Sequence, residues 1–115
     1  MGLEIRSGPA PSRMGRAPRR YSRAMFTVPI TLRHLMAGGV RATPGVSLDI
    51  SEGGLGAIVQ SALQVGETVE VELPLPGGKL SAVAIVRHAS SVCCGFEFLG
   101  LTGEERLQIA SAASS

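Results

Sequence analysis

The chain has 115 residues, which is enough for one domain with a single hydrophobic core. Hydrophobic residues make up 44% of it, but no apolar run reaches the roughly 18 residues that a membrane span requires, so no span is expected. The charge is uneven: residues 1–23 carry six arginines against Glu4, a net charge of +5, whereas the remainder is mildly acidic. A basic N-terminal segment of this kind favours an anionic partner.

Residues 1–18 are rich in Gly, Pro, Ser and Arg, and they show no hydrophobic periodicity. They also lack the apolar middle region of a secretory signal, so they predict a flexible basic leader before a domain at residues 19–115. The two cysteines, Cys93 and Cys94, are adjacent, which disfavours a disulfide between them, and they lack the further ligands of a zinc site. We therefore expect a cytoplasmic protein without a metal or a resident cofactor.

The domain opens with two alternating runs. From Met25 to Arg33 apolar and polar residues alternate as in a half-buried strand, and Pro29 predicts an unpaired side or a bulge. A turn is expected at residues 36–39. In the second run the apolar residues are Val46, Leu48 and Ile50, and the polar residues between and after them are Ser47, Asp49 and Ser51. With the apolar set inside, Asp49 and Ser51 are expected on the exterior.

Four further short runs follow, at residues 55–59, 68–75, 80–88 and 92–99, with a hairpin signal at 76–79. Thr102 and Glu105 then match a capping box, which predicts one amphipathic helix over residues 105–113. About six short strands and one terminal helix predict an all-β fold, a six-stranded antiparallel β-barrel with a short C-terminal α-helix and a flexible N-terminal arm.

Two polar clusters stand out. The first, Arg19-Arg20-Tyr21-Ser22-Arg23, precedes the first predicted strand, and the second, residues 49–54, runs from the second strand into its loop. If these strands form a hairpin that turns near Gly38, paired positions sum to about 76 and residue 24 lies opposite residue 52. A loop around residues 43–45 would shift this register by a few positions. The two clusters are therefore expected side by side.

The residue types in these clusters suit a particular ligand. Guanidinium groups fit phosphate oxygens and stack on bases, and Asp49 can accept hydrogen bonds from an N–H edge such as that of guanine. Ser51 adds a small donor and acceptor, while Gly53 and Gly54 are free to take positive φ and would let the backbone approach a ring closely. An anionic ligand that carries guanine satisfies all of these groups, whereas a plain phosphate would face the like charge of Asp49.

The pair Arg19-x-x-x-Arg23, followed by Asp49-x-Ser51-x-x-Gly54, resembles the signature of PilZ domains. The segments DISEGGLGA and CGFEFLGL and the helix start TGEER also resemble this family, over roughly residues 19–110. The resemblance implies a PilZ-type barrel that binds cyclic di-GMP and is not an enzyme.

By position, the resemblance implies that Arg19 and Arg23 clamp phosphate and guanine, with Arg20 as an auxiliary group. Asp49, Ser51 and Gly54 would then line the floor. The chain departs from the family at Ala24, where no proline follows promptly, which bears on the angle at which the arm leaves the barrel. We expect the arm to order over the barrel when the ligand binds and so to signal to an effector protein that the sequence does not identify.

Other interpretations stay open. A PilZ-like domain can act through protein contacts without binding a ligand, and the arginines alone could be a solvated tail. A barrel for polymeric nucleic acid is disfavoured by the acidic body and the scarcity of aromatic residues. His34 and His88 have no identifiable Ser, Cys or Asp partner, so they are read as a strand-end and a surface residue, and no catalytic residue is expected.

Overall fold

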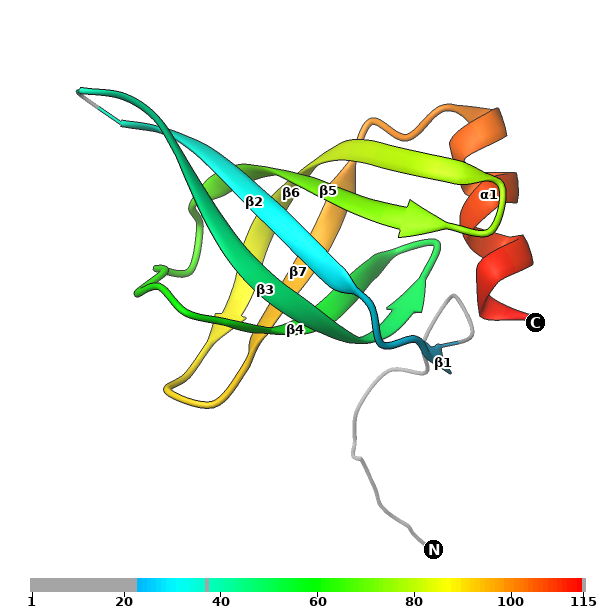
Figure 1. Ribbon diagram of the computed structural model, residues 1–115, viewed down its shortest axis with the longest axis horizontal. Coiled ribbons are helices and arrows are strands. Elements are labelled where there is room, and N and C mark those ends of the chain that lie inside the picture. The colour runs from blue at the N-terminus through cyan, green and yellow to red at the C-terminus, as the bar shows by residue number, and fades with distance from the viewer. Residues whose placement is uncertain (1–22, 37, 115) are drawn as a thin grey trace, which may run out of the picture.

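Seven strands and one helix make up the part of the chain that the computed structural model describes, residues 23–36 and 38–114 (Figure 1). The elements are β1 (Ala24–Met25), β2 (Pro29–Met36), β3 (Gly39–Ser51), β4 (Gly54–Val59), β5 (Thr68–Leu75), β6 (Gly78–Ala89), β7 (Cys94–Leu99) and α1 (Gly103–Ala113). The predicted leader at residues 1–18 lies outside the described residues.

The strands form one antiparallel sheet in the order β1-β3-β2-β5-β6-β7-β4, and a further pairing of β3 with β4 closes it. Strands β2 to β7 thus make a closed six-stranded barrel, and β1 is an extra strand along the outer edge of β3. The predicted fold class is confirmed. Closure leaves the six barrel strands without a continuous exposed edge, which is how small antiparallel barrels avoid pairing with other chains.

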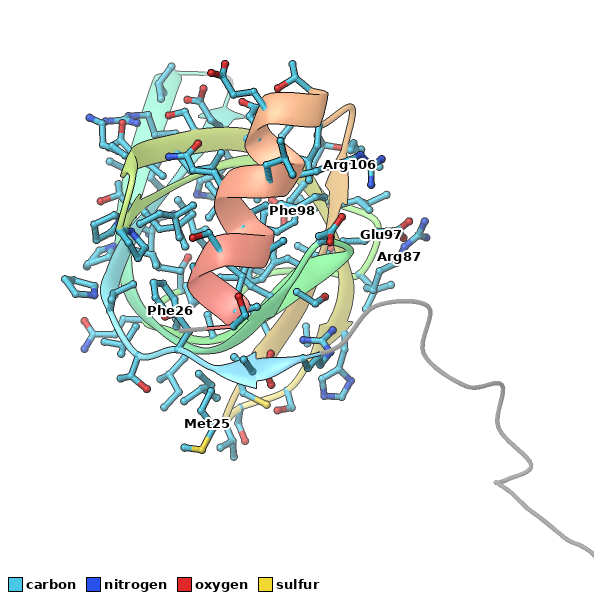
Figure 2. The ribbon with its side chains drawn as sticks, turned by 90° about the vertical axis from the view of Figure 1, so that its right-hand side faces the viewer. Met25, Phe26, Arg87, Glu97, Phe98 and Arg106 are labelled. Atoms are coloured by element: carbon cyan, nitrogen blue, oxygen red, sulfur yellow. The ribbon has the colours of Figure 1, made fainter. Side chains whose placement is uncertain are left out.

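The barrel interior holds the hydrophobic core. In β5 the alternation is regular, with Val69, Val71 and Leu73 buried and the residues between them facing outward. The helix α1 lies across one end of the barrel, where Ile109 and Ala112 join the core (Figure 2). These apolar side chains cover the open end of the barrel and shield its core from water.

The predicted capping box begins this helix. The backbone N–H of Glu105 donates to Thr102 Oγ1 at 3.1 Å, and the backbone N–H of Thr102 donates to Glu105 Oε1 at 2.9 Å. Because the cap is at Thr102, the helix begins at Gly103, two residues earlier than the apolar pattern predicts.

The first predicted strand is split in two. Residues 26–28 interrupt it, because the buried hydroxyl of Ser47 takes over their backbone groups: it accepts from the N–H of Val28 at 3.0 Å and donates to the carbonyl of Phe26. Pro29 then starts β2, a position where its missing N–H does not weaken the ladder.

Strand β3 is longer than predicted. The expected loop around residues 43–45 is wrong, because β3 runs continuously from Gly39 and Pro44 pairs with Thr31 of β2. Pro44 is tolerated because the pairing of β3 with β4 on its other side begins only at Gly45. The predicted turn after Met36 is confirmed, since Met36 pairs directly with Gly39.

The predicted faces of the second run are also wrong in part. The pairing of β3 with β4 shifts between Ser47 and Asp49, which marks a β-bulge at Leu48. Before the bulge Ser47 points inward and Val46 outward, and after it Ile50 points inward while Asp49 is half-buried at the surface. The sequence does not reveal this change, because polar and apolar residues keep alternating through the bulge while the face on which each residue lies changes there.

Candidate functional site

The two polar clusters meet through the short strand β1. Ala24 pairs with Ile50 and Met25 with Asp49, so the register argument places the segments correctly, with residue 24 opposite residue 50 rather than 52. One position of the difference comes from the hairpin turn, because paired residues of β2 and β3 sum to 75 and not 76, and the other comes from the interruption at residues 26–28, after which the sum is 74. Met25 itself points away from the barrel and is 89% exposed (Figure 2).

Arg23, the residue just before β1, reaches the surface of β3. Its Nη1 donates to Asp49 Oδ1 at 2.5 Å, and both side chains are partly exposed. This contact is the observed link between the incoming chain and the Asp-x-Ser-x-x-Gly segment. Arg19 and Arg20 lie outside the described residues, so their predicted roles stay predictions.

Asp49 also joins β3 to β4. Its Oδ1 accepts a second hydrogen bond from the backbone N–H of Gly56 at 3.0 Å, so one carboxylate oxygen holds β4 and Arg23 together. A carboxylate with an arginine on one side is charge-balanced, which reduces its repulsion toward an approaching anion. Both contacts use Oδ1, and Oδ2 is the oxygen that neither of them engages.

Ser51 is buried, although the sequence predicts it on the exterior beside Asp49. Its Oγ accepts from the backbone N–H of Gly53 at 3.2 Å and lies 3.5 Å from the carbonyl of Gly54. The hydroxyl is therefore folded back over its own loop, the local role that serines often take at turns. Any contact of Ser51 with a ligand would be made in addition to this role.

Gly53 and Gly54 do not adopt the positive φ that the sequence suggested; the described glycines with positive φ are Gly39, Gly66, Gly78 and Gly100. Gly53 uses its carbonyl instead, which accepts from the N–H of Phe98 at 3.0 Å. At Gly54 an added Cβ would lie 1.9 Å from the carbonyl oxygen of Phe96. Gly54 is thus required by the close approach of β4 and β7 rather than by a turn.

A row of residues crosses the outer wall beside Asp49. Asp49 pairs with Gly56 of β4, Gly56 with Gly95 of β7, and Gly95 with His88 of β6. Residues that pair across a sheet share a face, so the carboxylate and the imidazole stand at the two ends of a stretch of wall that carries no side chains. We call Gly56 and Gly95 the glycine floor.

Sequence reasoning missed the glycine floor and assigned His88 only to the surface. The glycines are visible in the sequence within the segments LGA and CGF. Only the register that pairs Gly56 with Gly95 shows that they are neighbours, and this register depends on the bulge at Leu48. A second bulge, between Val86 and His88, likewise determines where the imidazole stands.

An ion pair borders the glycine floor. Arg87 Nε donates to Glu97 Oε1 at 2.6 Å, joining β6 and β7 on the outer wall (Figure 2). Both side chains are about half exposed, so the pair adds little to stability. It does keep the Glu97 carboxylate neutralised beside a site whose predicted ligand is an anion.

The described residues offer no cluster of three or more His, Cys, Asp or Glu side chains that could hold a metal ion. The two cysteines are free thiols, and burial raises the pKa of the Cys94 thiol. A buried thiol with a raised pKa is a core residue and a poor nucleophile or ligand. In the part of the chain that the structure describes, no helix is long and apolar enough to cross a membrane.

An antiparallel barrel closed at one end by a helix, with an ion pair fastening Arg23 to its wall, defines a small all-β barrel domain. A family model of the PilZ domain matches residues 17–113, and the chain belongs to the PilZ domain family. This agrees with the resemblance carried by Arg23, Asp49, Ser51 and Gly54.

Solved structures give the same fold. The PilZ domain of YcgR from Escherichia coli, solved with c-di-GMP, matches with a TM-score of 0.70 and 20% identity over 85% of this chain and 90% of that one. The PilZ domain of CeSA from a cellulose-synthesizing bacterium matches with a TM-score of 0.62 and 20% identity, over 81% and 95% of the two chains. MotI/DgrA, an inhibitor of motility from Bacillus subtilis, matches with a TM-score of 0.65 and 18% identity, over 84% and 50%. No curated protein sequence matches the chain.

Proposed function

We propose that this chain is a cyclic di-GMP receptor and that it binds the ligand on the outer wall where Arg23 meets Asp49. The single observation that carries the proposal is that ion pair, because it brings the two halves of the PilZ signature together. The solved PilZ structures that contain c-di-GMP support it.

The chemistry of the site suits this ligand. The guanidinium group of Arg23, with those of Arg19 and Arg20 in the adjoining arm, would hold phosphate oxygens and stack on a guanine ring. Asp49 would accept from guanine N1–H and N2–H. Since the charge of Asp49 is already balanced by Arg23, Asp49 would offer the base a hydrogen-bond acceptor without presenting a net negative charge to the phosphates.

The proposal extends to how the receptor would signal. Binding would order the arm over the wall and change the surface that the domain presents to an effector protein. No step in it needs a catalytic residue, a metal or a cofactor. We place this role in the cytoplasm, where the free thiols Cys93 and Cys94 would stay reduced.

Isothermal titration calorimetry of the full chain with cyclic di-GMP tests the proposal. Arg23→Ala should weaken binding roughly 10-fold to 100-fold, because it removes a charge-assisted hydrogen bond to the ligand. Its effect on folding should stay below about 1 kcal/mol, because the ion pair with Asp49 is partly exposed.

Arg41→Ala is the matched control, since Arg41 is an exposed arginine of β3 far along the strand from Asp49. It should leave the affinity unchanged. The absence of any binding heat with the wild-type chain would favour the alternative of a PilZ-like interaction domain that does not bind the nucleotide. Equal losses in both variants would point to a diffuse charge effect instead.

A further inference from the structure

The strongest unassigned feature of the outer wall is the residue row that continues from Asp49 beyond the PilZ signature. Its far end is His88, an exposed residue of β6. An ideal Cβ on Gly95 would lie 3.4 Å from the Cβ of His88, so the histidine stands directly against the glycine floor. At the near end, a Cβ on Gly56 would lie 3.1 Å from Asp49 Oδ1.

The row leaves a strip of bare backbone between its two terminal side chains. Asp49 and His88 are separated by the two glycine-bearing strands β4 and β7, so their strands are three spacings of about 4.8 Å apart. The Asp49 carboxylate leans over Gly56, where its Oδ1, Oδ2 and Cγ lie 3.1, 3.5 and 3.6 Å from the position of an added Cβ. The open part of the floor is therefore at Gly95, and a flat base can lie there with one edge toward Asp49 and another toward His88. A side chain at Gly95 would lift the base from the backbone, whereas one at Gly56 would press against the Asp49 carboxylate.

We propose that His88 is a specificity-determining residue that donates a hydrogen bond to the O6/N7 edge of a guanine base lying on the glycine floor. The inference rests on the proposed function and extends it to a residue outside the arginine pair and the Asp-x-Ser-x-x-Gly segment. Asp49 accepts from the N1–H and N2–H of the same base, so the two walls read different edges.

This arrangement distinguishes guanine from adenine. Guanine presents two acceptors, O6 and N7, on the edge that faces His88, whereas adenine presents an N6–H₂ donor beside N7. An imidazole N–H therefore has a better partner on guanine, and Asp49 has no N1–H to accept from on adenine. The Arg87–Glu97 ion pair leaves Glu97 balanced, so it does not compete for the donor of His88.

The test is titration calorimetry of the full chain with cyclic di-GMP and with cyclic di-AMP. His88→Ala should weaken cyclic di-GMP binding roughly threefold to tenfold, the loss of one hydrogen bond, and should narrow the preference over cyclic di-AMP. His88→Gln keeps an N–H donor and should recover at least part of the affinity. Since His88 is exposed, all variants should melt within about 3 °C of the wild type.

A second pair of variants tests the floor itself. Gly95→Ala should weaken cyclic di-GMP binding, because its methyl group occupies the space between the base and the backbone beside His88. Gly103→Ala is the matched control, since an added Cβ there meets nothing within 4 Å. It should bind like the wild type.

The results separate this inference from the proposed function. If the wild-type chain binds cyclic di-GMP and His88→Ala binds it equally well, the role of His88 is wrong while the receptor function stands. Recovery by His88→Phe but not by His88→Gln would overturn the hydrogen bond. If the wild-type chain does not bind cyclic di-GMP at all, the receptor function fails and the inference fails with it.

Discussion

At the scale of single residues, the signature positions serve the fold before any ligand arrives. Asp49 fastens β4 through the N–H of Gly56, and Ser51 folds back over the loop that follows it. Gly54 permits the close approach of β4 to β7. A substitution at these positions therefore changes the wall itself, so loss of cyclic di-GMP binding in such a variant would not by itself identify a contact residue.

Gly54→Ala separates these two effects. The added methyl group would lie 1.9 Å from the carbonyl oxygen of Phe96, which is main chain and cannot rotate away. The variant should lose roughly 1–3 kcal/mol of unfolding free energy, as overpacked sites do. Urea denaturation followed by circular dichroism measures this loss, with Gly103→Ala as the control. Wild-type stability combined with abolished cyclic di-GMP binding would show instead that Gly54 acts through the ligand.

At the scale of elements, the sequence predicts periodic segments well and strand faces poorly. Strand β5 is predicted correctly, because its buried residues Val69, Val71 and Leu73 alternate with outward-facing residues without interruption. In β3 the same reasoning puts Val46 and Leu48 inside, where the bulge turns them outward. The position of a bulge is determined by pairing with the neighbouring strands, so it cannot be predicted from the residues of β3 alone.

The candidate site shows the same division. The neighbourhood of Arg23 and Asp49 follows from a hairpin argument that tolerates an error of two positions. The glycine floor does not follow from it, because it requires the exact register among β3, β4 and β7. The sequence alone does not reveal a role for His88 for the same reason, since a histidine on a strand has no identifiable role until its cross-strand neighbours are known.

Three strands of the outer wall are joined by one carboxylate. Glu72 of β5 lies 3.1 Å from Arg33 of β2 and 3.1 Å from Lys79 of β6. Hydrogen bonds from Arg33 and then from Lys79 lower the pKa of Glu72 below its ordinary value of 4.5. The charged form is therefore favoured in the folded state, and this contribution to stability is complete at pH values above about 4.5.

Glu72→Gln should consequently lower the melting temperature at pH 7 and lose its effect in acid. Because the folded-state pKa is lowered, the wild type loses this contribution as pH falls below 4.5 and through the lowered pKa, so the two melting curves converge. Differential scanning calorimetry from pH 7 to pH 3 measures the gap. Glu70→Gln, whose carboxylate is 3.9 Å from Arg33, should show a smaller gap. A gap that widens in acid would contradict the assignment.

At the scale of the whole molecule, the positive charge and the hydrophobic core lie in different parts of the chain. Among the described residues, the buried core comes from the barrel strands, the helix and Leu63 in the loop between β4 and β5, whereas Arg23 contributes an ion pair with Asp49. In the proposed receptor the barrel would supply the wall, and the arm would supply the cations that a dianionic nucleotide requires. We expect only the part of the arm nearest the wall to take part, from Arg19 onward.

Limited trypsin digestion locates that boundary, because six cleavage sites are spread along the arm, after Arg6, Arg13, Arg16, Arg19, Arg20 and Arg23. Saturating cyclic di-GMP should slow cleavage after Arg19, Arg20 and Arg23 by at least about tenfold, since a bound segment is cut only when it opens. Cleavage after the other three should continue at the ligand-free rate, as read by mass spectrometry of the released peptides. Arg23→Ala should abolish the protection. Equal protection of all six sites would extend the binding arm into residues 1–18, and no protection at any site would mean that the ligand does not order it.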